Sequence, residues 1–296
     1  MNMTPKKPLP WTVTDVRALP GDSAFLLDDG RCAILYDTGY AFTGARVAEN
    51  VRSVLGDRPL DYLFLTHSHY DHAAGSVHIR AAYPDVTVVA GAYAARIFAK
   101  PSARALMLEL DRKCAAAHGI TDYDDGLDDL CADVCVEDGD GIADTGFRAV
   151  ALPGHTRCSF GFYHEEHWLL LSSETLGVLY GDGSCIPAFL IGFGETLDSF
   201  AKAKSLPIDA MLLPHHGLIG GAAAAEFLRR SEQAARETAD RFARMISAGM
   251  TDAEILAQYT DEIYTDAVRQ TYPPDAFALN SSIMIALIRR ECTSGM

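Results

Sequence analysis

The sequence predicts an α/β protein in which sheets are layered against helices, with a helical extension at the carboxyl end. In the first two thirds of the 296 residues, short β-branched or apolar runs alternate with helical stretches, which is the pattern of sheets flanked by helices. From Ala222 onward, the composition changes to long segments with the apolar spacing of helices. We therefore expect a core domain over residues 1–221 and a helical extension over residues 222–296 that packs on it.

The core should contain two runs of strands separated by helices. Four strands are expected in the first part of the chain, at residues 11–19, 32–37, 61–66 and 86–89. Three amphipathic helices are expected between and after them, at residues 44–55, 73–83 and 102–117. Five further strands are expected between Gly and Asp turns, at residues 131–136, 147–152, 160–163, 168–171 and 210–213.

The extension should begin with one long amphipathic helix that Gly249 ends. Its inner face is formed by residues at helical spacing, namely Phe227, Leu228, Ser231, Ala235, Thr238, Phe242 and Met245. Thr251 and Glu254 form an S/T-x-x-E capping box that should start the next helix. A proline pair then breaks the chain before the apolar segment 282–288, which the pattern leaves open as helix or strand.

Composition and charge exclude several classes of partner. The formal charge of −15 repels phosphate backbones, which argues against a nucleic-acid partner. No segment is apolar over the length that crosses a bilayer, so no membrane partner is expected. Lys6 and Lys7 are followed by prolines rather than by the apolar stretch of a signal peptide, and the cysteines lack CxxC spacing. Both features favour a cytoplasmic protein with reduced thiols.

The residues that carry chemistry begin where the strand expected at 61–66 ends. This segment reads D-Y-L-F-L-T and runs directly into H-S-H-Y-D-H. His67 and His69 lie two positions apart in an extended chain, so they point to the same side and the strand end holds them in place. Asp71 and His72 follow as the chain turns into a helix. Neighbouring surface histidines can be accidental, but this density at a strand end is typical of a metal site for zinc, iron or manganese.

The H-x-H-x-D-H pattern resembles the signature of the metallo-β-lactamase superfamily and matches it without a gap. The resemblance implies a four-layer αβ/βα sandwich, in which further metal ligands come from loops of the second half at the same sheet edge. The segment P-G-H-T at 153–156 resembles the family's G-H-T loop. The resemblance therefore implies that His155 is the next metal ligand.

The family's carboxylate that bridges two metals falls here on Glu174 or on Asp182. In the family an aspartate follows a strand, and this chain has Glu174 at the end of the strand-like L-L-L-S-S. Glutamate is one methylene longer than aspartate, so it could bridge both metals or bind only one. Asp182 restores aspartate but lies farther from the strand. We favour Glu174, because placement at a strand end matters more than residue type.

The last ligand should follow the strand expected at 210–213. The segment L-L-P-H-H-G resembles the family's P-G-H-G, and aligning the prolines selects His216. His215 then takes the glycine position, where it lines the pocket, supports the ligands or fills space. A swap of the two roles stays open.

Two further residues beside the expected ligands have alternative interpretations. Asp37, in L-Y-D-T-G, is either a turn residue or, as the resemblance implies, a carboxylate that orients a metal-binding histidine. Tyr70 is either part of the pocket wall or an exposed aromatic residue.

The resemblance implies a hydrolase with two divalent metal ions, zinc as the first expectation and iron or manganese as alternatives. A metal-bound hydroxide would attack a small-molecule substrate, and Asp71 or Glu174 could accept a proton. No G-x-S-x-G nucleophile elbow is present. Glyoxalase II-like thioesterases and the quinolone-signal response thioesterases share the plan of a core followed by helices, so an ester or thioester substrate is our leading hypothesis.

Other function classes remain open from the sequence. They are a lactone or phosphodiester hydrolase, a non-haem iron oxidoreductase similar to the sulfur dioxygenases of the superfamily, and a non-catalytic ligand sensor that keeps the fold. The flavodoxin-like domain of the family's reductases has no room after residue 221, and the intact ligand set disfavours a sensor. The oligomeric state is open, with a homodimer as one option.

Overall fold

The computed structural model describes residues 4–294, the last three of them as backbone only. The first half of the chain forms a six-stranded sheet. Its strands, in chain and spatial order, are β1 (Thr12–Asp15), β2 (Phe25–Asp28), β3 (Ala33–Tyr36), β4 (Tyr62–Leu65), β5 (Thr87–Gly91) and β6 (Val134–Val136). β1 to β3 pair antiparallel, and β3 to β6 pair parallel. The carboxyl ends of β3 and β4 therefore lie side by side.

The second half forms a five-stranded sheet in the spatial order β13-β12-β9-β8-β7. Its strands are β7 (Phe147–Ala151), β8 (Phe160–His164), β9 (Leu169–Leu171), β12 (Ala210–Leu213) and β13 (Gly217–Gly220). β8 pairs antiparallel with both β7 and β9, and β9 pairs parallel with β12. β7, β9 and β12 therefore run in the same direction and end at the same edge. A separate hairpin joins β10 (Val178–Leu179) to β11 (Cys185–Ile186).

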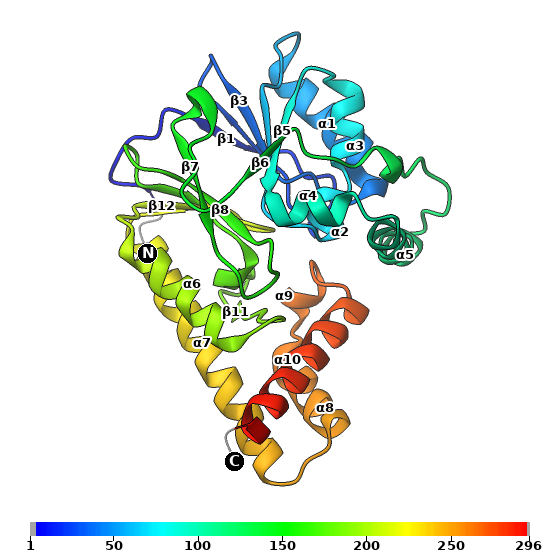
Figure 1. Cartoon of the computed structure of the whole chain (residues 1–296), viewed down its shortest axis with the longest axis vertical. Helices are drawn as coiled ribbons and strands as arrows, with labels where there is room; N and C mark the ends of the chain where they lie inside the picture. Colours follow the sequence, from blue (N-terminus) through cyan, green and yellow to red (C-terminus); the bar gives the residue numbers. More distant parts are fainter. Residues whose placement is uncertain (1–3, 295–296) are drawn as a thin grey trace.

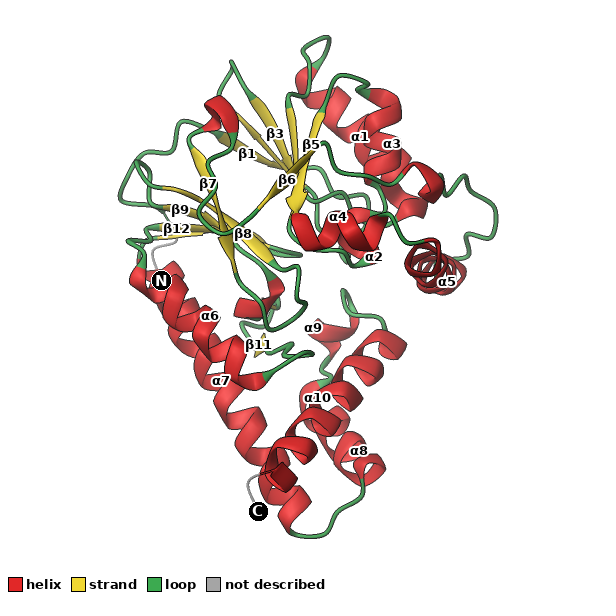
Figure 2. Cartoon of the chain, in the orientation of Figure 1, coloured by secondary structure: helices red, strands yellow, loops and turns green. Residues whose placement is uncertain are grey.

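Helices cover the outer face of each sheet, as Figures 1 and 2 show. The helices on the side of the first sheet are α1 (Ala41–Leu55), α2 (Tyr70–Ala73), α3 (Ser76–Ala82) and α4 (Ala92–Phe98), and α5 (Pro101–Ala117) packs on α1, α2 and α4. Those beside the second are α6 (Phe193–Ser205) and α7 (Ala222–Ser247).

Buried apolar residues form three clusters, one for each interface of this layered arrangement. Between the sheets, the rings of Phe64 and Phe162 lie 4.6 Å apart. Val47 of α1 belongs to the cluster outside the first sheet, and Phe200 of α6 to that outside the second. The four-layer αβ/βα prediction is confirmed.

The carboxyl-terminal helices share the hydrophobic cluster of the second sheet. They are α7, α8 (Asp252–Ile263), α9 (Asp266–Arg269) and α10 (Pro274–Ser294). The expected inner face of α7 is buried, and the capping box of Thr251 and Glu254 at the start of α8 is present, which confirms both predictions. Segment 282–288 lies within α10 and is therefore helical. None of the described helices is long and apolar enough to cross a membrane.

Several expected elements differ in extent from those observed. The helix expected at 73–83 begins later, as α3, and Ala73 ends the short helix α2. Gly75 lies between the two helices and packs so closely on the Thr38 carbonyl oxygen that a Cβ atom would collide with it. β1 and β6 are shorter than the strands expected at 11–19 and 131–136. β2, β13, α4 and α6 are additional elements that the sequence patterns did not identify.

The start of α1 is capped by a residue from α5 rather than by the residue at its own N-cap position. Tyr40 at the N-cap makes no side-chain cap, and the Ala41 N–H instead donates to Asp111 Oδ1 at 2.8 Å. Asp111 is buried and also accepts a hydrogen bond from the Tyr123 hydroxyl. This contact ties α5 to the core.

We expect Asp111→Ala to lower the free energy of unfolding by about 1–2 kcal/mol, because it removes a helix cap and leaves a buried N–H without a partner. Urea unfolding measures the change. Asp111→Asn is the matched control, since its amide oxygen can still cap α1. An alanine variant as stable as the wild type would show that this cap is not needed.

Candidate metal centre

Side chains with metal-binding groups follow several strands at the edge where the strands end. His67 lies two residues after β4, and His155 follows β7. Glu174 follows β9, and His215 follows β12. The shared direction of these strand ends brings together residues far apart in the chain.

Two hydrogen bonds connect the sheets next to this edge. The Phe160 N–H, at the start of β8, donates to the Thr66 carbonyl at 2.8 Å. The buried Tyr36 hydroxyl donates to the Ser172 carbonyl at 2.7 Å. Because each bond joins the first half of the chain to the second, the two sets of loops keep a fixed spacing.

One group of potential ligands is formed by His67, His69, His155 and Glu174, whose ligand atoms all lie within 4.8 Å of one another. His155 Nε2 is 2.8 Å from Glu174 Oε2 and 2.9 Å from His69 Nδ1. His67 Nε2 is 3.9 Å from Glu174 Oε2, and it is buried with no hydrogen-bond partner among the described residues.

A second group is formed by Asp71, His72 and His215. His215 Nε2 lies 3.2 Å from His72 Nε2 and 3.9 Å from Asp71 Oδ2. It also lies 2.9 Å from Glu174 Oε1. The two oxygens of Glu174 therefore face different groups, Oε2 the first and Oε1 the second.

The other ring nitrogen of several histidines is held by a fixed acceptor. His155 Nδ1 donates to the Ala188 carbonyl at 3.0 Å, and His215 Nδ1 donates to the Gly21 carbonyl at 2.9 Å. His72 Nδ1 donates to Asp37 Oδ2 at 2.8 Å. Because these acceptors take a proton from Nδ1, each Nε2 keeps its lone pair toward the cluster, as a metal ligand requires.

The expectation that His216 supplies the last ligand is wrong in the structure, where His215 joins the cluster and His216 belongs to neither group. His215 adopts a left-handed backbone with φ of 60°, and Arg17 Nη1 donates to its carbonyl. This conformation directs the His215 ring at Glu174. His216 is half-buried outside the cluster, where burial lowers its pKa.

The structure also shows where Asp182 and Asp37 lie, the two carboxylates whose roles the sequence left open. Asp182 is exposed and bonds to Ser184 and Thr265, away from both groups. Asp37 is fully buried and, besides His72, accepts hydrogen bonds from Thr66 and Ser23. Asp37 therefore orients His72 rather than only closing a turn.

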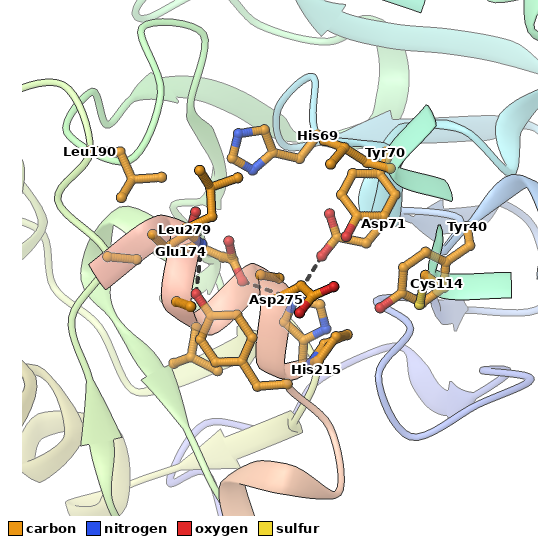
Figure 3. A pocket seen from close by; sticks show the side chains of 18 of the residues that line it. Tyr40, His69, Tyr70, Asp71, Cys114, Glu174, Leu190, His215, Asp275 and Leu279 are labelled. Carbon is orange, nitrogen blue, oxygen red and sulfur yellow. Dashed lines mark hydrogen bonds and ion pairs between the residues drawn. The ribbon is translucent and has the colours of Figure 1, made fainter. Parts of the chain in front are cut away.

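A cavity of about 760 Å³ opens directly onto the cluster. His69, Asp71, Glu174 and His215 surround its inner part (Figure 3). Tyr70 lines the same cavity, so it is part of the pocket wall rather than an exposed aromatic residue.

Burial and neighbouring charges set the protonation of the centre. Burial, followed by neighbouring imidazoles, lowers the pKa of His67 and of His69 well below the ordinary value. Burial opposes the charge of His72, but the carboxylates of Asp71 and Asp37 outweigh it and raise its pKa well above the ordinary value. Burial also opposes the charge of Glu174, yet His155 and the other imidazoles lower its pKa well below the ordinary value. Burial thus favours the neutral form of His67 and His69, whereas the carboxylates around His72 and Glu174 attract positive charge.

These residues fit divalent metal ions. Nitrogen and carboxylate oxygen donors at this spacing are the ligands of zinc, iron and manganese sites. The isolated Nε2 of His67 supports the fit, because a buried polar atom without a partner is costly unless a cation satisfies it.

Comparison with known protein families assigns the chain. The sequence model described as the metallo-beta-lactamase superfamily matches residues 19–216. The chain belongs to this superfamily. A comparison with curated protein sequences finds no match.

Solved structures of the superfamily share this fold at low sequence identity. A metallo-beta-lactamase family protein from Thermus thermophilus is 19% identical with a TM-score of 0.61, over 90% of this chain and 88% of its own. A beta-lactamase domain protein from Burkholderia ambifaria is 16% identical with a TM-score of 0.61, over 91% of this chain and 81% of its own. A flavo di-iron protein from Thermotoga maritima is 18% identical with a TM-score of 0.51, over 72% of this chain and 52% of its own. At this identity the likeness shows the fold alone.

Sequence patterns did not identify several residues that support the centre. Arg17 holds the His215 carbonyl, and the backbone carbonyls of Gly21 and Ala188 orient two ligand candidates. No local motif marks these positions, because their partners lie far away in the chain. Gly154, beside His155, is a supporting residue that the P-G-H-T motif does contain. Its φ of 141° and its packing on Thr175 and Thr196 exclude a side chain at this position.

We expect His215→Ala to lower the affinity for zinc more than 100-fold, because a side chain that contacts the metal contributes more than the groups that orient it, whose loss costs about 10–100-fold. Metal analysis after dialysis against a defined zinc concentration measures the loss. His216→Ala is the matched control and should keep the metal content of the wild type. Loss of metal in the His216 variant, with full metal content in the His215 variant, would show that His216 is the ligand, as the sequence motif predicted.

Asp37→Asn should weaken zinc binding by about 10–100-fold, because the amide is a poorer acceptor for His72 Nδ1. A competition titration with a chromophoric chelator measures the dissociation constant. Thermal unfolding of the metal-free protein reports any general loss of stability. Unchanged affinity would contradict the orienting role.

Proposed function

We propose that the protein is a metal-dependent hydrolase of small esters or thioesters that uses two divalent ions, zinc being the first expectation. The observation that carries the proposal is Glu174, whose two oxygens face separate groups of potential ligands beside a large pocket. His67, His69 and His155 would hold one ion, and Asp71, His72 and His215 the other. Glu174 would span both.

The chain's own residues have distinct parts in the reaction. When bound, divalent ions acidify water and polarise the carbonyl of a substrate. The imidazoles keep their ligand atoms aimed at the cluster through the bonds on the opposite ring nitrogens. Asp71 lines the pocket, with Oδ2 3.9 Å from His215 Nε2, so its carboxylate can accept the proton of a water molecule held at the cluster.

The size and lining of the cavity support an organic substrate. A volume of about 760 Å³ lies in the range of small-molecule sites and is far more than dioxygen or nitric oxide requires. Apolar side chains such as Met107, Val178 and Leu190 line it together with the cluster. A centre that handles only diatomic gases has no use for such a pocket, which disfavours a gas reductase, whereas the assays below distinguish hydrolysis from the oxidation of an organic substrate.

The metal-loaded protein should hydrolyse members of a panel of thioesters and esters, and removal of metal by a chelator should abolish the activity. Asp71→Asn should lower kcat by about 100-fold or more, because it removes a proton acceptor and weakens a ligand. A panel of lactones and phosphodiesters tests the neighbouring hydrolase classes.

Two results would contradict the proposal. One is oxygen consumption by iron-loaded protein without any hydrolysis, which would indicate redox chemistry. The other is stoichiometric ligand binding without turnover, which would indicate a sensor.

A further inference from the structure

The pocket extends from the cluster between two helices that are far apart in the chain. α5 contributes Leu106 and Leu110, and α10 contributes Leu279 and Ile283. Leu106 and Leu279 are 57% and 49% exposed, which is unusual for leucine in this chain. Leu279 and Glu174 line the same cavity (Figure 3). The metal centre therefore opens into a passage with an apolar lining on both sides.

The charges along this passage give no support for an anionic ligand. Among the described residues that line it, Lys113 is the only lysine or arginine, and it pairs with Glu109 at 2.8 Å. The acidic residues of the lining are Asp71, Glu174 and Asp275. With a formal charge of −15 on the whole chain, a leaving group with several phosphates would meet repulsion rather than binding groups.

We propose that the substrate is a neutral ester or thioester whose apolar chain lies between α5 and α10 while its scissile carbonyl lies at the cluster. This inference rests on the proposed hydrolase function and specifies its substrate class. Each methylene of the substrate's apolar chain that becomes buried should increase the binding affinity by about fourfold. The side of the scissile bond that carries the chain is distinguished by the experiment below.

The test uses neutral thioesters whose other side is too small to fill the pocket. With metal-loaded protein, S-methyl esters of ethanethioic, butanethioic and octanethioic acid place the chain on the acyl side, and S-octyl ethanethioate places it on the thiol side. Release of thiol is followed with a disulfide reagent. We expect kcat/KM to rise by about fourfold per methylene in one of the two series. Octanoyl coenzyme A, which carries the same acyl chain on a polyanionic thiol, should react more slowly than its neutral S-methyl counterpart.

Variants at the exposed leucines test the position of the chain. In the series whose rates rise with chain length, Leu106→Gln and Leu279→Gln should each reduce the ratio of the kcat/KM of the octyl-length thioester to that of S-methyl ethanethioate by about tenfold. Glutamine retains good helix propensity. Val54→Gln is the matched control, because Val54 is an exposed apolar helix residue outside the pocket. It should change neither the ratio nor the rates.

Binding of stable amides separates failure of this inference from failure of the proposed function. NMR titration with hexanamide and acetamide should show more than about tenfold tighter binding of hexanamide, and Leu279→Gln should reduce that preference. If no thioester is hydrolysed but hexanamide still binds more tightly than acetamide, the hydrolase proposal is wrong, whereas the proposed binding site for an apolar chain between α5 and α10 is supported. Equal binding of the two amides, or rates independent of chain length in both series, would overturn the inference.

Discussion

The centre depends on one buried carboxylate, that of Glu174, which two groups of imidazoles share. Oε2 lies 2.8 Å from His155 Nε2, and Oε1 lies 2.9 Å from His215 Nε2. A buried carboxylate costs several kcal/mol unless positive charge lies beside it. His67 and His69 contribute little of that charge, because burial lowers the pKa of each well below its ordinary value, whereas the carboxylates beside His72 raise its pKa. Divalent cations would satisfy the carboxylate and the unpaired Nε2 of His67 together, in accord with the burial of these polar groups in one place.

The scaffold around Glu174 is rigid for reasons that can be traced to particular bonds. Four strand ends from both sheets provide the ligand candidates, and the bonds from Phe160 to Thr66 and from Tyr36 to Ser172 keep the sheets in register at that edge. Asp37 and backbone carbonyls hold the histidine rings from behind. The ligand candidates are thus preorganised by groups that do not themselves belong to the cluster.

Local patterns predicted much of this arrangement. Alternating strands and helices, the capping box of α8 and the dense His and Asp motif after β4 depend on neighbouring residues, so the sequence contains them directly. The position of Glu174 at a strand end was also recognisable. The choice between His215 and His216 failed because alignment of a motif takes no account of a left-handed φ at His215 or of Arg17 holding its carbonyl from 198 positions away. The cap of α1 by Asp111 was missed for the same reason, since it depends on tertiary packing.

The helical extension lines the pocket that opens onto the centre. α10 forms one side of the pocket that opens at Glu174, and α5, tied to the core by Asp111, forms another. The family shows the fold and the centre suggests the chemistry, whereas these two helices give the pocket a largely apolar lining in which, among the described residues, Lys113 is the one basic side chain of lysine or arginine type.

The most direct test is a crystal structure of zinc-loaded protein with anomalous data collected at the zinc absorption edge. The account predicts two peaks, one among His67, His69 and His155 and the other among Asp71, His72 and His215, with an oxygen of Glu174 at coordination distance from each. A single peak, or a peak at His216, would contradict it.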